Sequence, residues 1–121
     1  MTLTSLVIGA HAAAREAAIA AAIDPVISTV VILEGLAAGV SHLTATSTLQ
    51  IIRIAPGCMC CVGNLTLRVT LNRLLRKPPA RLFIALATNT HLPQIRDFLT
   101  QEPYDAFLTL TDDIGSVKDA N

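Results

Sequence analysis

Short, nearly continuous apolar runs alternate along this chain with longer segments in which apolar residues recur at helical spacing. Residues 27–33 are almost all β-branched or aliphatic, which is typical of a strand buried on both faces of a sheet. Residues 64–76 place leucines and a valine at helical intervals with arginines between them, which predicts an amphipathic helix. Such patterns predict strands at residues 3–10, 27–33, 49–54, 81–87 and 106–111. They predict helices at residues 11–23, 64–76 and 91–101.

The alternation of strands with helices indicates βαβ units joined by right-handed crossovers. We therefore expect an α/β fold, with a mostly parallel five-stranded sheet and helices on both faces. The Gly-, Ser- and Thr-rich residues 34–47 are predicted to form a loop with at most a short helical turn. Because we find no linker and no internal repeat, residues 1–121 are expected to form a single domain, with the polar residues 112–121 as a flexible tail.

The composition narrows the classes of function. Apolar residues make up 52% of the chain, charged residues make up 15%, and the formal net charge is zero. This balance excludes a disordered chain and offers no electrostatic footprint for nucleic acid or for an anionic membrane. There is no apolar run of about 18 residues, as a membrane-spanning helix needs, and no basic leader precedes the alanine-rich residues 12–23, so we expect a cytoplasmic protein. The low charge also favours self-association into a homo-oligomer.

All three cysteines of the chain lie in the sequence Gly57-Cys58-Met59-Cys60-Cys61. Thiolates at this spacing can converge on one zinc or similar ion without help from distant residues. Alternatively, Cys58 and Cys61 form a Cys-x-x-Cys pair before a predicted helix, where the helix dipole favours a reactive thiolate and thiol redox chemistry. In a third interpretation the cysteines are a remnant that packs as small apolar residues. An odd, tightly spaced set does not indicate a secreted disulfide framework.

The cysteine motif also carries a resemblance to a known family. A strand, loop, helix and two strands lead into this motif, and a Leu/Arg-rich helix follows it, an order that resembles the first half of the CobW-type metallochaperone GTPases. The similar block covers residues 51–87, and residues 106–112 resemble the family's next strand. The resemblance implies a P-loop-NTPase-like half domain, and zinc or cobalt bound by Cys58, Cys60 and Cys61.

Two histidines are candidates for a fourth metal ligand. His11 and His91 each follow a predicted strand, and parallel α/β sheets bind their ligands at the carboxyl ends of strands. The third histidine, His42, falls in the predicted loop.

The segment that would bind nucleotide phosphates departs from the family pattern. A phosphate loop needs Gly-x-x-x-x-Gly-Lys-Ser/Thr, because its glycines let backbone N–H groups wrap the phosphates, its lysine balances their charge and its hydroxyl holds Mg²⁺. In the matching segment, which begins at Gly9, Ala14 replaces the second glycine, Arg15 the lysine and Glu16 the hydroxyl. A carboxylate at a helix start occupies and repels an anion site.

Two further departures point the same way. The family's acidic, glycine-containing stretch appears here as Thr88-Asn89-Thr90-His91, and the chain has no Asn-Lys-x-Asp element for reading guanine. We therefore expect no bound nucleotide and no GTPase activity.

The sequence as a whole favours a non-catalytic metal-binding or regulatory module. An interaction protein that pairs with itself or with a full-length CobW-type relative is the alternative, followed by a thiol redox protein. A basic group could contact an acidic partner or form a solvated helix face; its members are Arg68, Arg73, Arg76, Lys77 and Arg81. Glu34 and Asp112-Asp113 also end predicted strands, but their spacing does not indicate an acid–base pair.

Overall fold

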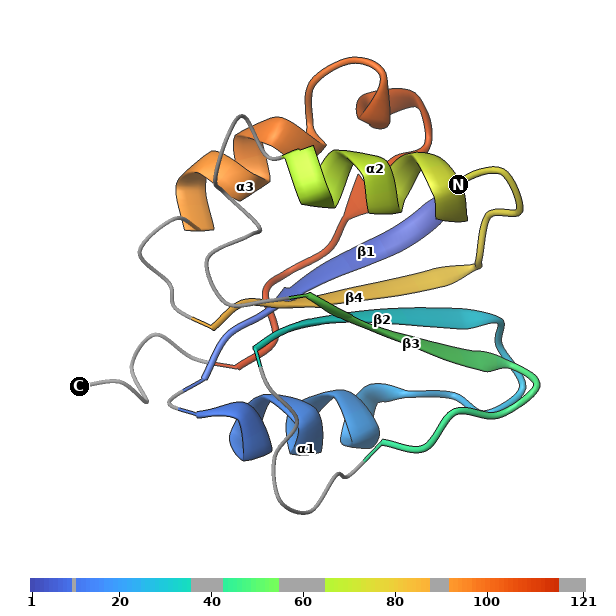
Figure 1. Cartoon of the computed structure of the whole chain (residues 1–121), viewed down its shortest axis with the longest axis vertical. Coiled ribbons are helices and arrows are strands. Elements are labelled where there is room, and N and C mark those ends of the chain that lie inside the picture. The colour runs from blue at the N-terminus through green and yellow to red at the C-terminus, as the bar shows by residue number, and fades with distance from the viewer. Residues whose placement is uncertain (10, 36–42, 55–64, 88–91, 116–121) are drawn as a thin grey trace.

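The computed structural model describes residues 1–9, 11–35, 43–54, 65–87 and 92–115 (Figure 1). In this part of the chain, five strands form one sheet in the order β3-β2-β4-β1-β5, and every neighbouring pair is parallel. The strands are β1 (Thr2–Val7), β2 (Thr29–Glu34), β3 (Leu49–Ile54), β4 (Arg81–Ala85) and β5 (Leu108–Leu110). The helices are α1 (Ala12–Ala22), α2 (Leu65–Leu74) and α3 (Leu92–Leu99), with a short 3₁₀ helix, η2, at Tyr104–Ala106. The expected α/β fold class is confirmed.

The helices cover the two faces of the sheet unequally. Helices α2 and α3 lie together on one face, whereas α1 lies on the opposite face beneath the end of the sheet at which β1 finishes (Figure 1). On the α2–α3 face, Leu71 and Ile95 belong to a core that includes Leu6 and Ile84 of the sheet. On the α1 face a smaller core gathers around Ile19, which is fully buried.

All the predicted strands and helices are present, and most are shorter at one or both ends than the sequence predicts. The bounds of β3 agree with the prediction, whereas β1 begins one residue earlier and β2 ends one residue later than predicted. Strand β1 ends at Val7 rather than at position 10, because the chain turns there into α1. Strand β5 begins at Leu108 because the preceding residues form the 3₁₀ turn. In the loop predicted at 34–47, residues 36–42 lie outside the described residues.

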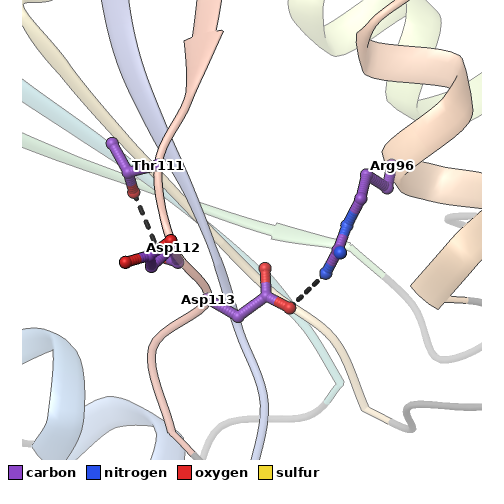
Figure 2. A network of polar contacts seen from close by, with 4 residues as sticks. All are labelled: Arg96, Thr111, Asp112 and Asp113. Carbon is purple, nitrogen blue, oxygen red and sulfur yellow. Dashed lines mark hydrogen bonds and ion pairs between the residues drawn. The ribbon is translucent and has the colours of Figure 1, made fainter.

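Of the flexible tail expected at residues 112–121, residues 116–121 lie outside the described residues, and Ile114 pairs with β1. Ile114 forms a parallel bridge with Val7, donating its N–H to Leu6 O over 2.9 Å and accepting from Ile8 N over 3.0 Å. In Figure 2, Arg96 of α3 pairs with the carboxylate of Asp113. The segment after β5 is therefore fixed to both the sheet and α3.

Gly115 completes this attachment. Its φ of +82° is in the left-handed region that favours glycine, and a Cβ at this position would lie 2.0 Å from the carbonyl oxygen of Ile8. The close approach of the two backbones thus requires glycine, and it supports the chain just where β1 leads into α1.

Among the described helices, none combines the length and apolar character needed to cross a bilayer.

Candidate functional site

The connection from β1 to α1 lies at the carboxyl edge of the sheet, in the position where a phosphate loop is expected. His11 is the N-cap of α1 in extended conformation, and its Nδ1 accepts a hydrogen bond from Ala14 N over 3.2 Å. A helix start leaves its first N–H groups without intrahelical partners, and these groups are what bind anions. Here the imidazole of His11 accepts a hydrogen bond from one of these N–H groups, that of Ala14.

Arg15 folds back onto the turn that precedes it. Its side chain is only 6% exposed, and Nη1 donates to the carbonyl oxygen of Gly9 over 3.2 Å. A Cβ at Gly9 would lie 3.2 Å from Cγ of Arg15, so the arginine stem packs directly on the glycine backbone. The guanidinium is consequently engaged within the loop in which a lysine would face phosphate.

Glu16 faces the sheet rather than the open end of the helix. It lies beyond the first turn of α1, is 2% exposed, and its Oε2 is 3.8 Å from Nη1 of Arg53 on β3. Our expectation that this carboxylate would lie at the helix start therefore needs correction. Because of helical periodicity the side chain points inward to β3, where it makes an ion-pair contact with Arg53.

Glu34, the last residue of β2, is the second buried carboxylate near Arg15. Its Oε1 accepts from Ala87 N over 2.8 Å, which ties the end of β2 to the chain just after β4. Burial lowers the pKa of Arg15, while the carboxylates of Glu34 and, less strongly, Glu16 oppose that shift. The Arg15 guanidinium therefore has nearby negative charge supplied by the chain itself.

We call Arg15, Glu16, Glu34 and Arg53 the edge cluster. Its formal charges sum to zero, and charges taken out of water are tolerated when they are paired and hydrogen-bonded. The cavity that these residues line, together with Ala12, Leu33, Gly35 and Ala85, has a volume of about 10 Å³. That space suits about one water molecule. A phosphate group needs far more room, so this cavity in its present form does not admit one.

Sequence reasoning identified only part of the edge cluster. The sequence indicates a role for Arg15 and Glu16 and gives none for Glu34, whereas Arg53 falls within the strand predicted at residues 49–54 without a role of its own. A signal for Arg53 was available, since it alternates with Ile52 and Ile54 and thus shares a face with the residues that pack toward α1.

The predicted metal ligands Cys58, Cys60 and Cys61 lie outside the described residues, as do His91 and the rest of the sequence Thr88–His91. In the parts of the chain that are described, no group of three or more His, Cys, Asp or Glu side chains is arranged to hold a metal ion. The elements on either side of the cysteines do match the expectation, because β3 ends at Ile54 and α2 begins at Leu65.

The position of His11 bears on its candidacy as a fourth ligand. Its Nδ1 accepts a hydrogen bond, so a neutral ring carries its proton on Nε2. Metal binding through either nitrogen would therefore require the ring to give up the cap. His11 remains a candidate ligand, at the cost of the hydrogen bond to Ala14.

Comparison with known proteins gives one informative similarity. The chain is 42% identical over 69 residues to the zinc chaperone YeiR of Escherichia coli (strain K12). The match covers 56% of this chain and 21% of that protein, so the chain spans about a fifth of its length. No protein-family model matches, and no solved structure gives a significant match. The similarity supports a relationship to CobW-like proteins.

Proposed function

We propose that this chain is a non-catalytic zinc-binding module that uses Cys58, Cys60 and Cys61 as ligands and has lost nucleotide binding. The observation that carries the proposal is the similarity to a protein named as a zinc chaperone, over more than half of this chain. Three thiolates suit zinc and leave a fourth position for His91, His11, water or a donor from another molecule.

The chemistry of the cysteine segment fits a metal cation. Residues 55–64 contain three cysteines and no Asp, Glu, Lys or Arg, so thiolates are the strongest ligands that the segment offers. Cobalt is a second candidate metal, since a thiolate set of this kind accepts both ions.

The edge cluster supports the loss of nucleotide binding. A bound phosphate would have to displace Arg15 from the Gly9 carbonyl and would approach the carboxylates of Glu16 and Glu34. Both steps cost free energy, because they leave buried polar groups unpaired and bring like charges together. We therefore infer that GTP hydrolysis is not an activity of this chain.

A competition titration tests the metal proposal. Metal-free protein, purified without a metal-affinity column, is titrated with zinc in the presence of a chromophoric chelator of micromolar affinity. We expect one zinc per chain to be taken from the chelator, and the simultaneous change of all three cysteines to serine to abolish this. Met59→Leu is the matched control, because it alters the same segment without removing a thiol. Failure of the unaltered protein to compete with the chelator would contradict the proposal.

Alkylation kinetics separate zinc binding from thiol redox chemistry. Under the proposal, the cysteines of the metal-free protein react with iodoacetamide at similar rates, and zinc protects all three. A redox protein would instead show one thiol that reacts much faster than the others near neutral pH. Calorimetric titration with GTP is expected to give no binding heat.

A further inference from the structure

The α1 face of the sheet is left partly uncovered near the amino ends of β1, β4 and β5. The parallel register aligns Arg81 of β4, Leu3 of β1 and Thr109 of β5 in one row across three strands. Leu3 is 46% exposed although it lies within a strand next to the centre of the sheet. In the described part of the chain, α1 is the helix on this face, and it lies toward the opposite end of the strands (Figure 1).

This exposure is unusual for a parallel sheet. Such sheets occur almost only with both faces covered, commonly by helices. On the other face of the same strands, Leu6 and Ile84 are buried under α2 and α3. The contrast indicates that the row of Arg81, Leu3 and Thr109, which we call the open row, is a surface that a further helix can cover.

Arg81 gives the open row a fixed positive charge. Its Nη1 donates to Leu3 O over 3.1 Å, its Nη2 donates to Ser5 Oγ over 2.8 Å, and its guanidinium carbon lies 4.4 Å from the ring centroid of Phe83. Ser5 Oγ in turn contacts the hydroxyl of Thr111, the residue that follows the neighbouring strand β5. The guanidinium is thereby held flat over the sheet rather than extended into solvent.

In the described part of the chain, the guanidinium of Arg81 has no carboxylate as counterion. Burial lowers the pKa of this group, so the guanidinium is partly removed from water. No ion pair joins Arg81 to any carboxylate among the residues described. Guanidinium carries five N–H donors, of which two are used here, so further N–H groups can meet a carboxylate.

We propose that the open row is a docking site for an amphipathic helix of another protein, with apolar residues against Leu3 and an Asp or Glu side chain against Arg81. Charge complementarity selects an acidic helix. A second copy meeting this one through the same face would bring the two Arg81 side chains toward each other, which disfavours a symmetric dimer here. This inference goes beyond the zinc proposal and does not depend on it.

Binding of a designed helical peptide tests the inference. The probe is a fluorescein-labelled, lactam-stapled peptide with leucines at helical spacing and glutamates flanking them, and its partner probe has lysines in place of the glutamates. Fluorescence anisotropy is expected to show saturable binding of the glutamate peptide to the unaltered protein. Leu3→Asp and Arg81→Glu should each weaken that binding by about tenfold or more. Arg81→Glu should also reverse the preference toward the lysine peptide.

Val69→Asp provides the matched control. Val69 is 49% exposed, close to the value for Leu3, but it lies on α2 at the other face of the sheet, so this variant should bind like the unaltered protein. Thermal unfolding verifies that each variant is folded. If Arg81→Glu does not fold, Arg81→Gln replaces it in the test of the charge. Absence of saturable binding, equal binding of the two peptides, or insensitivity to Leu3→Asp would overturn the inference. Dimerisation in sedimentation that Leu3→Asp abolishes would equally overturn it, in favour of a second copy as the occupant.

Discussion

Two connections that lead from a strand into a helix on this sheet differ in the chemistry they offer. Where β1 leads into α1, the charged side chains of the helix residues Arg15 and Glu16 contact partners from the same chain, including Arg53 and the Gly9 carbonyl. Between β3 and α2, residues 55–64 carry three thiols and no side chain with a fixed charge. Because the charged side chains at the first connection already have partners within the chain, an anion would gain few new contacts there. The thiols of the second connection are ligands suited to a metal cation. We therefore propose that the two connections differ in function, with phosphate binding lost at the first and metal binding kept at the second.

The largest effect on stability is expected at Gly115, which supports the β1–α1 connection from outside. Gly115→Ala would place a Cβ 2.0 Å from Ile8 O in a left-handed conformation, so the free energy of unfolding should fall by about 3 kcal/mol. Urea denaturation followed by circular dichroism measures the change.

Gly35→Ala is the control for conformation alone. Gly35 also has a positive φ, +121°, but no atom of the described residues lies within 4 Å of the position that its Cβ would take. We expect a loss of about 1 kcal/mol there. Equal losses at the two glycines would show that contact with Ile8 is unimportant.

The next largest effect on stability tests whether the ion pair between Glu16 and Arg53 stabilises the edge cluster. Glu16→Ala should lower the free energy of unfolding by about 2 kcal/mol, less than for a fully buried pair because Arg53 is 32% exposed. Glu16→Gln, which preserves shape, separates charge from packing.

A double-mutant cycle with Arg53→Met isolates the contact between the two side chains. A coupling energy indistinguishable from zero would remove Glu16–Arg53 from our account of the site. None of these variants is expected to gain GTP binding, because Arg15 stays bonded to Gly9.

Much of this fold could be predicted from the sequence, and the site only in part. The apolar run that forms β2 and the Leu/Arg pattern of α2 each depend on local periodicity, which a sequence displays directly. The edge cluster depends on the register that brings Arg53 of β3 near Glu16 of α1, and that arrangement is set by the packing of distant segments. The attachment of Ile114 and Gly115 to β1 was missed for the same reason, since polar neighbours conceal a pairing more than 100 positions away along the chain.

A smaller effect is expected from the helix cap. His11→Ala removes the acceptor for Ala14 N and should lower the free energy of unfolding by about 1 kcal/mol. His11→Asn, which restores a capping side chain, is expected to recover most of that loss.

His11→Ala and His11→Asn also test whether His11, at the β1–α1 connection, contributes to zinc binding by the cysteine segment. If His11 supplied the fourth zinc ligand, His11→Asn would weaken zinc binding despite its restored stability. Unchanged zinc affinity in both variants would leave His91, water or an external donor as the fourth ligand.

The smallest effect concerns Tyr104, which is hydrogen-bonded to Asn72 of α2. Its hydroxyl donates to Asn72 Oδ1 over 2.9 Å, and burial raises its pKa above the ordinary 10.0, with Arg68 opposing the shift. The folded protein then keeps a proton that the unfolded chain loses, so stability should decline as the pH rises through 10 and beyond.

Ultraviolet titration of phenolate absorption measures this pKa without ambiguity, because the chain has a single tyrosine and no tryptophan. Tyr104→Phe should remove this part of the decline at high pH. A midpoint at or below 10 would contradict the predicted burial.

Titration of the metal-free protein with cobalt(II) tests the central claim most directly, because thiolate-to-cobalt charge transfer reports the ligands themselves. We predict intense near-ultraviolet bands that saturate at one cobalt per chain, decrease in each single Cys-to-Ser variant, disappear on addition of zinc, and are unaffected by GTP. The absence of thiolate-to-cobalt bands in the unaltered protein would contradict the account.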